Sequence, residues 1–435
     1  MNYIKYLRFN LNRLSNYHLF LIYICFLLLI FIPLVIYSNI YLEKFPDIIN
    51  KDNNLIFNSL QFDYADLLTN LYENGHYVQK IGTFEVNFHL ARMPFYPFFF
   101  LLLSKISLNF YFIFFVKNLF IFSVIFFSVL NFLKRNDKLI YHLIIFLVAF
   151  IYVPYNFHVL ASINFEDTFI SVFFPILIFY LNQGSKSLLI FSILIFSLYL
   201  LKSSLWIFCI SFTIIYFFFN FFRHRFSRNK YFFFPLFLLL IAIIGWGTFG
   251  LKKAGYFAIG PSVSSISTYY ATSMFNKKFH KNYPQVSVDK LLDDKYNFLE
   301  FENEKNFYNY FKKENLKFLD QHYDLYLIGV LKKINFIFFG VNKDGNLDHK
   351  IVQVRYSNFP NKIIMNFALV VALVSFFKMI KKGKLSEIDF LFLAMFILYI
   401  APHIVAWATS KHLVPIFLLS KIYLLIKCFK IKIID

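Results

Sequence analysis

The 435-residue chain is poor in charge, in glycine and in cysteine. Only 16% of its residues are charged, whereas soluble domains carry about 25%. Apolar residues make up 59%, and 65 residues are phenylalanine. This composition excludes an ordinary soluble enzyme and places the chain in a lipid bilayer. The three cysteines, Cys25, Cys209 and Cys428, predict neither a disulfide framework nor a thiolate metal site.

Motifs of the common soluble enzyme classes are missing from the sequence. It has no Walker loop, dinucleotide fingerprint, HExxH zinc motif or nucleophile elbow, and 12 glycines make a phosphate-binding glycine loop implausible. The net charge of +20 does not indicate nucleic-acid binding. The basic residues cluster in short loops between apolar runs, as the positive-inside rule predicts for a membrane protein.

Long apolar runs predict about ten membrane spans. They lie at about 18–40, 110–133, 139–155, 165–183, 188–201, 203–222, 231–250, 362–380, 388–408 and 412–428. The distribution of charge decides whether a further apolar run, at 94–109, crosses the membrane. A crossing there would move the later basic loops to the outside, against the positive-inside rule. We therefore expect an interfacial or re-entrant helix, begun by Pro94 and Pro97, and both termini in the cytoplasm.

This topology predicts an all-α polytopic membrane protein in three parts, with juxtamembrane helices on the outer side. Residues 1–250 form a transmembrane catalytic module that includes a first outward loop at 41–109. Residues 251–361 form a small outward-facing loop domain of two or three short helices, the last of which, at about 321–339, is amphipathic against the membrane. Residues 362–435 supply the C-terminal transmembrane helices.

The first outward loop carries a cluster of acids. If 59–75 is a helix, steps of three and four place polar side chains on one face, namely Asp63, Asp66, Asn70 and Glu73. The opposite face is apolar and consists of Tyr64, Leu67, Leu68 and Leu71. The acids either line a reaction cleft or form the solvated face of an amphipathic helix.

A cation follows where the chain returns to the interface, in the segment Ala91-Arg92-Met93-Pro94-Phe95-Tyr96-Pro97. The guanidinium of Arg92 is suited to hold a phosphate with two parallel hydrogen bonds. The alternative is an arginine that merely extends its charge from the interface into water.

The turn between the third and fourth spans carries two adjacent acids, Glu166 and Asp167, on the same outer side. They either cap a helix start or take part in function, since acids this close to hydrocarbon are costly without partners. Basic residues face the same side before later spans, at Lys202, Lys411 and His412. These residues either neutralise a lipid phosphate or serve as interface anchors.

Together these elements resemble the GT-C superfamily of polytopic glycosyltransferases, especially the relatives of protein O-mannosyltransferases and of lipid A aminoarabinose transferases. Asp63, in FDYADLL, takes the place of that family's first acid, and Glu166 or Asp167 takes the place of the second. The family's Arg-x-Pro-x-Tyr-Pro segment is matched at 92–97, and its late basic element with a proline at 411–415.

The resemblance implies an enzyme of the bacterial inner membrane that transfers a sugar from a polyprenyl-phosphate donor to a glycan, lipid or protein at the outer face. It implies Asp63 as general base and Glu166 and Asp167 as further catalytic acids. The implied substrate-binding residues are Asp66, Arg92, Tyr96, Lys202, Lys411 and His412. A divalent metal, if one takes part, is expected at Asp63 and Glu166. The 251–361 domain is expected to cap the cleft and recognise the acceptor.

Three other functions fit the same layout. An O-antigen polymerase or ligase shares the lipid donor, but it relies on outward arginines, of which the 251–361 loop has only Arg355. A non-enzymatic lipid or solute transporter needs ionisable groups within the bilayer, where the sequence offers Lys117 with Asn118. A structural membrane subunit has no need of the acids in the first outward loop.

Overall fold

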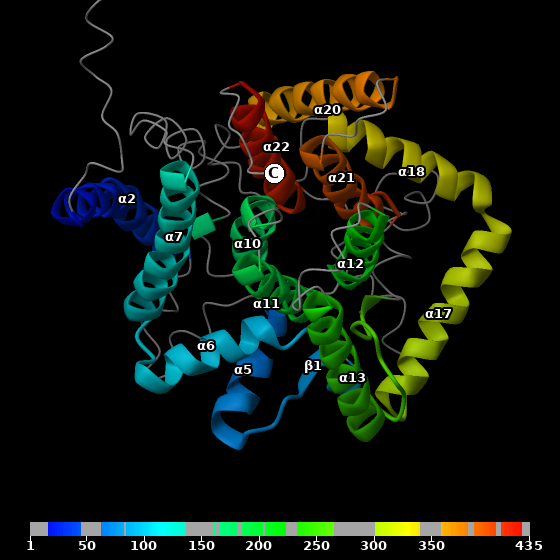
Figure 1. Ribbon diagram of the computed structural model, residues 1–435. Helices are drawn as coiled ribbons and strands as arrows, with labels where there is room; N and C mark the ends of the chain where they lie inside the picture. Colours follow the sequence, from blue (N-terminus) through cyan, green and yellow to red (C-terminus); the bar gives the residue numbers. More distant parts are fainter. Residues whose placement is uncertain are drawn as a thin grey trace, which may run out of the picture.

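Helices dominate the computed structural model, which describes residues 16–44, 62–81, 84–135, 160–161, 166–180, 185–202, 205–222, 233–264, 301–339, 358–381, 387–405 and 410–428 (Figure 1). In chain order the helices are α2 (Asn16–Lys44), α5 (Phe62–Asn74), α6 (Phe95–Ile106), α7 (Phe110–Arg135), α10 (Asp167–Tyr180), α11 (Ser185–Leu201), α12 (Leu205–Phe222), α13 (Phe234–Ala254), α17 (Glu304–Gln321), α18 (Tyr323–Phe338), α20 (Asn358–Lys381), α21 (Glu387–Val405) and α22 (Ser410–Cys428). Two short strands, β1 (Gln79–Ile81) and β2 (Phe84–Phe88), form an antiparallel hairpin that the sequence analysis did not predict.

Five described helices are long and apolar enough to cross a membrane. These segments belong to α2, α7, α13, α20 and α21, and each coincides with a predicted span. Length and composition therefore support the predicted class of a helical integral membrane protein. The predicted span at 139–155 lies outside the described residues.

The remaining described spans are shorter or more polar than a typical membrane helix. α10, α11 and α12 have 14, 17 and 18 residues, and α22 has 19 residues that include three lysines. α6 has 12 residues, which make roughly 18 Å of helix and cannot cross a hydrocarbon core of about 30 Å. As predicted, α6 begins directly after Pro94, and it packs against α5, α7 and α11.

The core of the bundle is formed around α10 and α22, which pack against each other at its centre (Figure 1). All side chains of α22 from His412 to Tyr423 are buried, as expected of a helix surrounded by protein. By contrast, α2 and α20 expose large apolar side chains such as Phe31, Ile36 and Phe367. A row of this kind is the surface that lipid covers in a membrane protein.

The described part of the predicted first outward loop includes α5, which packs against α6 and β1, and the β1–β2 hairpin (Figure 1). The predicted apolar face of α5 is confirmed, because its four members are buried: Tyr64, Leu67, Leu68 and Leu71. Glu73, on the predicted polar face, is exposed. After α5, Gly75 has a φ of 67°, a left-handed conformation that suits glycine and ends the helix.

The described part of the predicted loop domain is an arm of two helices, α17 and α18, along one edge of the molecule (yellow in Figure 1). α18 confirms that the predicted segment at 321–339 is a helix; it exposes Tyr323, Leu327 and Leu331 and packs against α20 and α21. The start of α17 contacts β2. The arm therefore bridges the C-terminal helices and the first outward loop.

Candidate functional site

Glu166 and Asp167 lie at the start of α10 and are both buried. Asp167 is the first helical residue, while the carbonyl of Glu166 accepts hydrogen bonds from the amides of Phe169 and Ile170. Negative charge at a helix N-terminus is favoured by the helix dipole. Part of the cost of burying these carboxylates is offset in this way, and the remainder must be offset by other elements.

Lys202, directly after α11, supplies the principal counter-charge. Its Nζ lies 2.6 Å from Asp167 Oδ1 and 3.7 Å from Glu166 Oε1. The ammonium was predicted to bind a phosphate, but in this structure its donors are directed at protein groups. Lys202 thus holds the two acids in place, and 35 residues of chain separate it from Asp167.

His412, in the first turn of α22, joins the same cluster. Its Nδ1 lies 3.0 Å from both Asp167 Oδ1 and Lys202 Nζ. The nitrogen therefore accepts from the lysine when it carries no proton and donates to the carboxylate when it does. We call Glu166, Asp167, Lys202 and His412 the carboxylate centre. Four predicted site residues from three distant segments of the chain meet there.

α5 and the segment before α6 reach the carboxylate centre from another side. The hydroxyl of Tyr64 donates a short hydrogen bond to Glu166 Oε2. The guanidinium of Arg92 stacks over the Tyr64 ring, with Cζ 5.0 Å from the ring centroid, a favourable cation–π geometry. Burial, together with the charge of Glu166, raises the pKa of the Tyr64 hydroxyl, so this residue remains a donor.

Arg92 is the half-buried cation of this region. Burial lowers the pKa of its guanidinium, and the charge of Glu166 opposes that shift. Arginine stays protonated under such conditions. Arg92 therefore brings a permanent positive charge into the electrostatic field of the carboxylate centre.

Two predicted residues have side chains outside the described part of the structure: Asp63 in the first turn of α5 and Lys411 in the first turn of α22. Their neighbours in sequence, Tyr64 and His412, both reach the carboxylate centre. Position 63 is thus the neighbour of a residue whose side chain reaches Glu166. The direction of the Asp63 side chain stays a prediction.

Two other predicted substrate-binding residues have packing or tethering contacts. Asp66 accepts hydrogen bonds from the Lys80 amide at 2.7 Å and from Asn70 Nδ2 at 3.3 Å, which ties α5 to β1. Tyr96 is fully buried, with its ring 5.1 Å from that of Tyr64. These contacts account for the positions of both residues without a ligand.

A metal site receives no support from the described part of the chain. No group of three or more His, Cys, Asp or Glu side chains there is placed to hold a metal ion. Glu166, one of the two predicted ligands, is engaged by the Tyr64 hydroxyl and lies beside Lys202. A metal bound with the help of Asp63 stays a prediction.

Three aromatic or imidazole residues near the centre were not predicted as part of it. Tyr399 donates to the carbonyl oxygen of His412 at 2.8 Å, and the His403 ring stacks on the His412 ring at 4.9 Å. Tyr77 donates to the carbonyl oxygen of Arg92 at 2.9 Å. No local motif marks these residues, because each acts through a contact with a distant segment.

Lys117 and Asn118, which the transporter hypothesis singled out, are buried in α7. Lys117 Nζ donates to the Leu160 carbonyl at 2.8 Å and Asn118 Nδ2 to the Ala161 carbonyl at 3.3 Å, while Lys117 Nζ also lies 3.4 Å from Thr168 Oγ1. The pair therefore fixes the chain around the start of α10.

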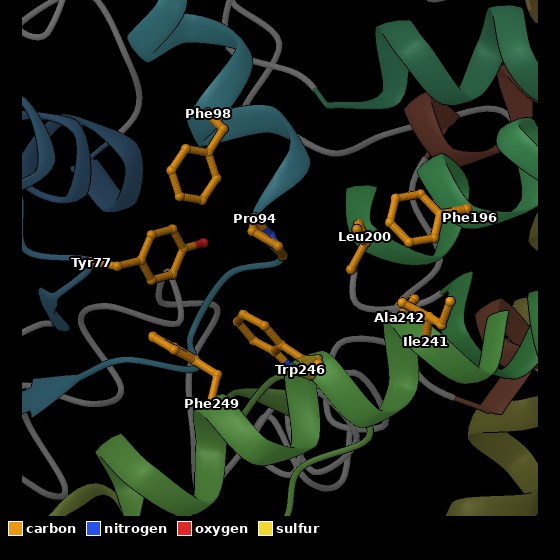
Figure 2. A pocket seen from close by; sticks show the side chains of 10 residues that line it. Tyr77, Pro94, Phe98, Phe196, Leu200, Ile241, Ala242, Trp246 and Phe249 are labelled. Atoms are coloured by element: carbon orange, nitrogen blue, oxygen red, sulfur yellow. The ribbon is translucent and has the colours of Figure 1, made fainter. Parts of the chain in front are cut away.

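The structure also contains an apolar pocket of about 370 Å³ (Figure 2). It is lined by Tyr77, Pro94, Phe98, Phe196, Leu200, Ile241, Ala242, Gly245, Trp246 and Phe249. Figure 2 shows the Tyr77 hydroxyl pointing toward Pro94, with Phe98, Trp246 and Phe249 around the ring. The volume lies in the range of about 300–1,000 Å³ that is usual for sites of small ligands.

The chain connects this pocket directly to the cations. Pro94 is two residues from Arg92, and Leu200 is two residues from Lys202, so each cation is within about 7 Å of a pocket residue along the backbone. Tyr77 both lines the pocket and bonds to Arg92. The apolar pocket and the charged residues are thus connected by short stretches of backbone.

Comparisons with known proteins found no match: no family model, no curated protein and no solved structure is similar to the chain. Fold and site together define a helical membrane protein with a buried carboxylate–lysine–histidine cluster and an apolar pocket two residues away along the chain at Leu200. The resemblance of the sequence motifs to GT-C glycosyltransferases remains an expectation, and function has to be argued from the site itself.

Proposed function

We propose that the protein is a membrane glycosyltransferase that uses a polyprenyl-phosphate-linked sugar. The observation that carries this proposal is a chain of contacts: Tyr77 lines the apolar pocket and bonds to Arg92, and Arg92 stacks on Tyr64, which bonds to Glu166 of the carboxylate centre. A lipid-phosphate sugar presents the same sequence of chemistries: an apolar chain, an anionic phosphate and a polar sugar. A structural subunit gives no reason for two buried carboxylates held in this way.

The lipid end of the donor is assigned to the pocket. Its walls are aromatic and aliphatic side chains from α6, α11 and α13, with Tyr77 beside them. Isoprenoid units have no hydrogen-bonding groups, so contact with such walls is favoured by the hydrophobic effect, at about 25 cal/mol per Å² buried. The chain of the lipid would continue from the pocket into the bilayer.

The phosphate of the donor is assigned to Arg92, the half-buried cation two residues from the pocket. In the transfer step, the hydroxyl or amine of the acceptor forms a bond to the anomeric carbon while the bond from that carbon to the phosphate oxygen breaks. The electron pair leaves with the lipid phosphate. A fixed cation stabilises the charge that grows on this leaving group, and attack from the opposite side inverts the anomeric carbon.

The proton lost by the acceptor is assigned to Asp63. A general base of this kind typically contributes about 10²- to 10⁴-fold to the rate. Glu166 and Asp167, held by Tyr64, Lys202 and His412, then orient the acceptor and balance the positive charge of the site. Since Lys202 already bonds to Asp167, its role is to position the acids.

The membrane arrangement belongs to the same proposal. We place ten spans in a bacterial inner membrane, both termini in the cytoplasm, and the site at the outer face with the 251–361 segment. The basic loops support this orientation through the positive-inside rule. Reporter fusions at Asn136 and Asn229 test it: both are expected to report a cytoplasmic location, and an external signal at either position contradicts the topology.

The function is tested in membranes that contain the wild-type chain or a variant, supplied with a panel of radiolabelled polyprenyl-phosphate sugars. Asp63→Asn is expected to lower sugar transfer by about 10²–10⁴-fold at matched protein level. Glu73→Gln is the control, because Glu73 is an exposed acid on the same helix, and it is expected to keep wild-type transfer. Undiminished transfer by Asp63→Asn removes Asp63 as the base.

A further inference from the structure

Glu304 joins the described loop domain to the segment that carries Arg92. It is the first residue of α17, it is 2% exposed, and its two carboxylate oxygens accept the backbone amides of His89 at 2.8 Å and Leu90 at 3.0 Å. These two amides come directly after β2, where the strand pairing has ended. A carboxylate with one amide on each oxygen is a strong, charge-assisted contact.

Hydrogen bonds offset part of the free-energy cost of burying this carboxylate. Burial raises the pKa of the Glu304 carboxyl above its ordinary value, while the hydrogen bonds from His89 and Leu90 act in the opposite direction. A buried acid is tolerated when donors of this kind compensate for lost water. Because 215 residues separate Glu304 from His89, the contact links two parts of the chain that are distant in the sequence.

Packing around the contact leaves the segment little freedom. The amide of Ser262 donates to the Leu90 carbonyl at 2.9 Å, and the rings of Phe88 and Phe307 meet edge to face at 4.7 Å. The backbone at Gly250 approaches so closely that an added Cβ would lie 3.2 Å from Leu90 Cδ1 and 2.8 Å from the carbonyl oxygen of Tyr256. Residues 88–90 are therefore held between α13 and α17.

Arg92 is two residues after Leu90, so the restraint on residues 88–90 also acts on the charged site. His89 Nδ1 lies 3.0 Å from the Tyr77 carbonyl, and the Tyr77 hydroxyl donates to the Arg92 carbonyl. Arg92 in turn stacks on Tyr64, which bonds to Glu166. A continuous set of contacts thus leads from α17 to the carboxylate centre.

We propose that Glu304 is a positioning residue for Arg92, so that docking of α17 and binding of a lipid phosphate at the site are coupled. This inference rests on the proposed function for its ligand but not for the contact itself. The 301–339 segment then acts on the donor side of the reaction, in addition to any contact with the acceptor. Coupling of this kind is reciprocal: the bound phosphate must also stabilise the docked α17.

The first test measures hydrogen exchange by mass spectrometry on the purified full-length chain, in peptides that cover 86–93 and 304–311. Loss of hydrogen bonds to a charged acceptor in Glu304→Ala is expected to speed exchange of the His89 and Leu90 amides by about ten- to hundredfold. Glu304→Gln keeps one acceptor oxygen and is expected to have a smaller effect. Glu302→Gln is the matched control, because Glu302 is exposed and bonds only locally to Asn306 among the contacts described.

The second test compares binding of a polyprenyl monophosphate with binding of the corresponding polyprenol, which lacks the phosphate. Glu304→Ala is expected to weaken the monophosphate about tenfold and to leave the polyprenol unchanged, since only the phosphate meets Arg92. In the wild type, bound monophosphate is expected to slow exchange at 86–93 and in the first turn of α17.

Unchanged exchange at 86–93 in Glu304→Ala overturns the proposal. So does faster exchange with an equal loss of both ligands, which indicates a general structural role. If the wild type binds neither lipid, the proposed function fails, and the exchange result alone then decides whether Glu304 fixes the Arg92 segment.

Discussion

Two buried ion-pair clusters lie toward opposite ends of α22, and they differ in what surrounds them. At the N-terminal end is the carboxylate centre, with His412. Toward the other end, Asp389 of α21 accepts the Tyr423 hydroxyl at 2.6 Å and lies 2.6 Å from Lys427 Nζ. The 11 residues from His412 to Tyr423 place the two clusters roughly 16 Å apart along the helix. We call Asp389, Tyr423 and Lys427 the distal cluster.

The distal cluster is self-contained. One carboxylate faces one ammonium and one hydroxyl, Asp389 is fully buried, and the apolar pocket is lined by other helices. The carboxylate centre has two adjacent acids and is linked through Tyr64 and Arg92 to the wall of the pocket. A buried ion pair alone therefore does not mark a site. The second acid and the link through Tyr64 and Arg92 to a residue of the pocket distinguish the functional candidate.

The largest expected contrast is between the acids of the two clusters. Glu166→Gln is expected to lower sugar transfer by about 10²-fold or more while the protein remains folded. Asp389→Asn is expected to lower the free energy of unfolding by about 3–5 kcal/mol, because it leaves Lys427 without its buried partner, yet to keep transfer per folded molecule. The measurements are transfer rates normalised to folded protein, and denaturant unfolding in detergent. Loss of transfer in folded Asp389→Asn breaks the distinction.

A matched pair of hydroxyl deletions sharpens the comparison. Tyr423→Phe removes a hydrogen bond to Asp389 and is expected to cost about 1.5–3 kcal/mol of stability, with the transfer rate unchanged. Tyr64→Phe removes the hydrogen bond to Glu166 and is expected to reduce transfer about tenfold. Equal effects of the two substitutions on transfer count against a special role for the carboxylate centre.

In the pocket, the expected effect is on donor binding alone. Gly245 lies on α13 with no atom within 4 Å of an added Cβ, so Gly245→Leu fills pocket space without a backbone clash. We expect KM for a long-chain donor to rise about tenfold, equivalent to about 1.4 kcal/mol, with kcat nearly unchanged. Gly245→Ala is the control and is expected to change KM less than twofold. An unchanged KM in Gly245→Leu contradicts the assignment of the donor lipid to this pocket.

The sequence predicted those features that depend on local pattern. The spacing of three and four along 62–74 predicted the buried face of α5, and Pro94 correctly marked the start of α6. Apolar length predicted the five membrane-crossing helices. The alternation of Phe84, Val86 and Phe88 was a signal for the hairpin that was not predicted. In a strand of five residues beside long apolar runs, this signal is weak.

Features that depend on contacts between distant segments were not predictable. The pairing of Lys202 with Asp167 and of Glu304 with His89 requires the helices to be packed first. Tyr77 carries no motif and acquires a role only because the hairpin brings it to Arg92. The acids themselves were visible in the sequence. Which acids meet which cations was a property of the three-dimensional arrangement.

The most direct test of the central claim is lipid binding reported by Trp246, which lines the pocket. The chain has three tryptophans, so a Trp206→Phe, Trp407→Phe protein makes Trp246 the reporter. A polyprenyl monophosphate is expected to change its fluorescence at a concentration at least tenfold lower than the corresponding polyprenol does, and Arg92→Leu is expected to abolish this difference. Equal binding of the two lipids by the wild-type site, or no response to either, contradicts the assignment of a lipid-phosphate donor to this pocket.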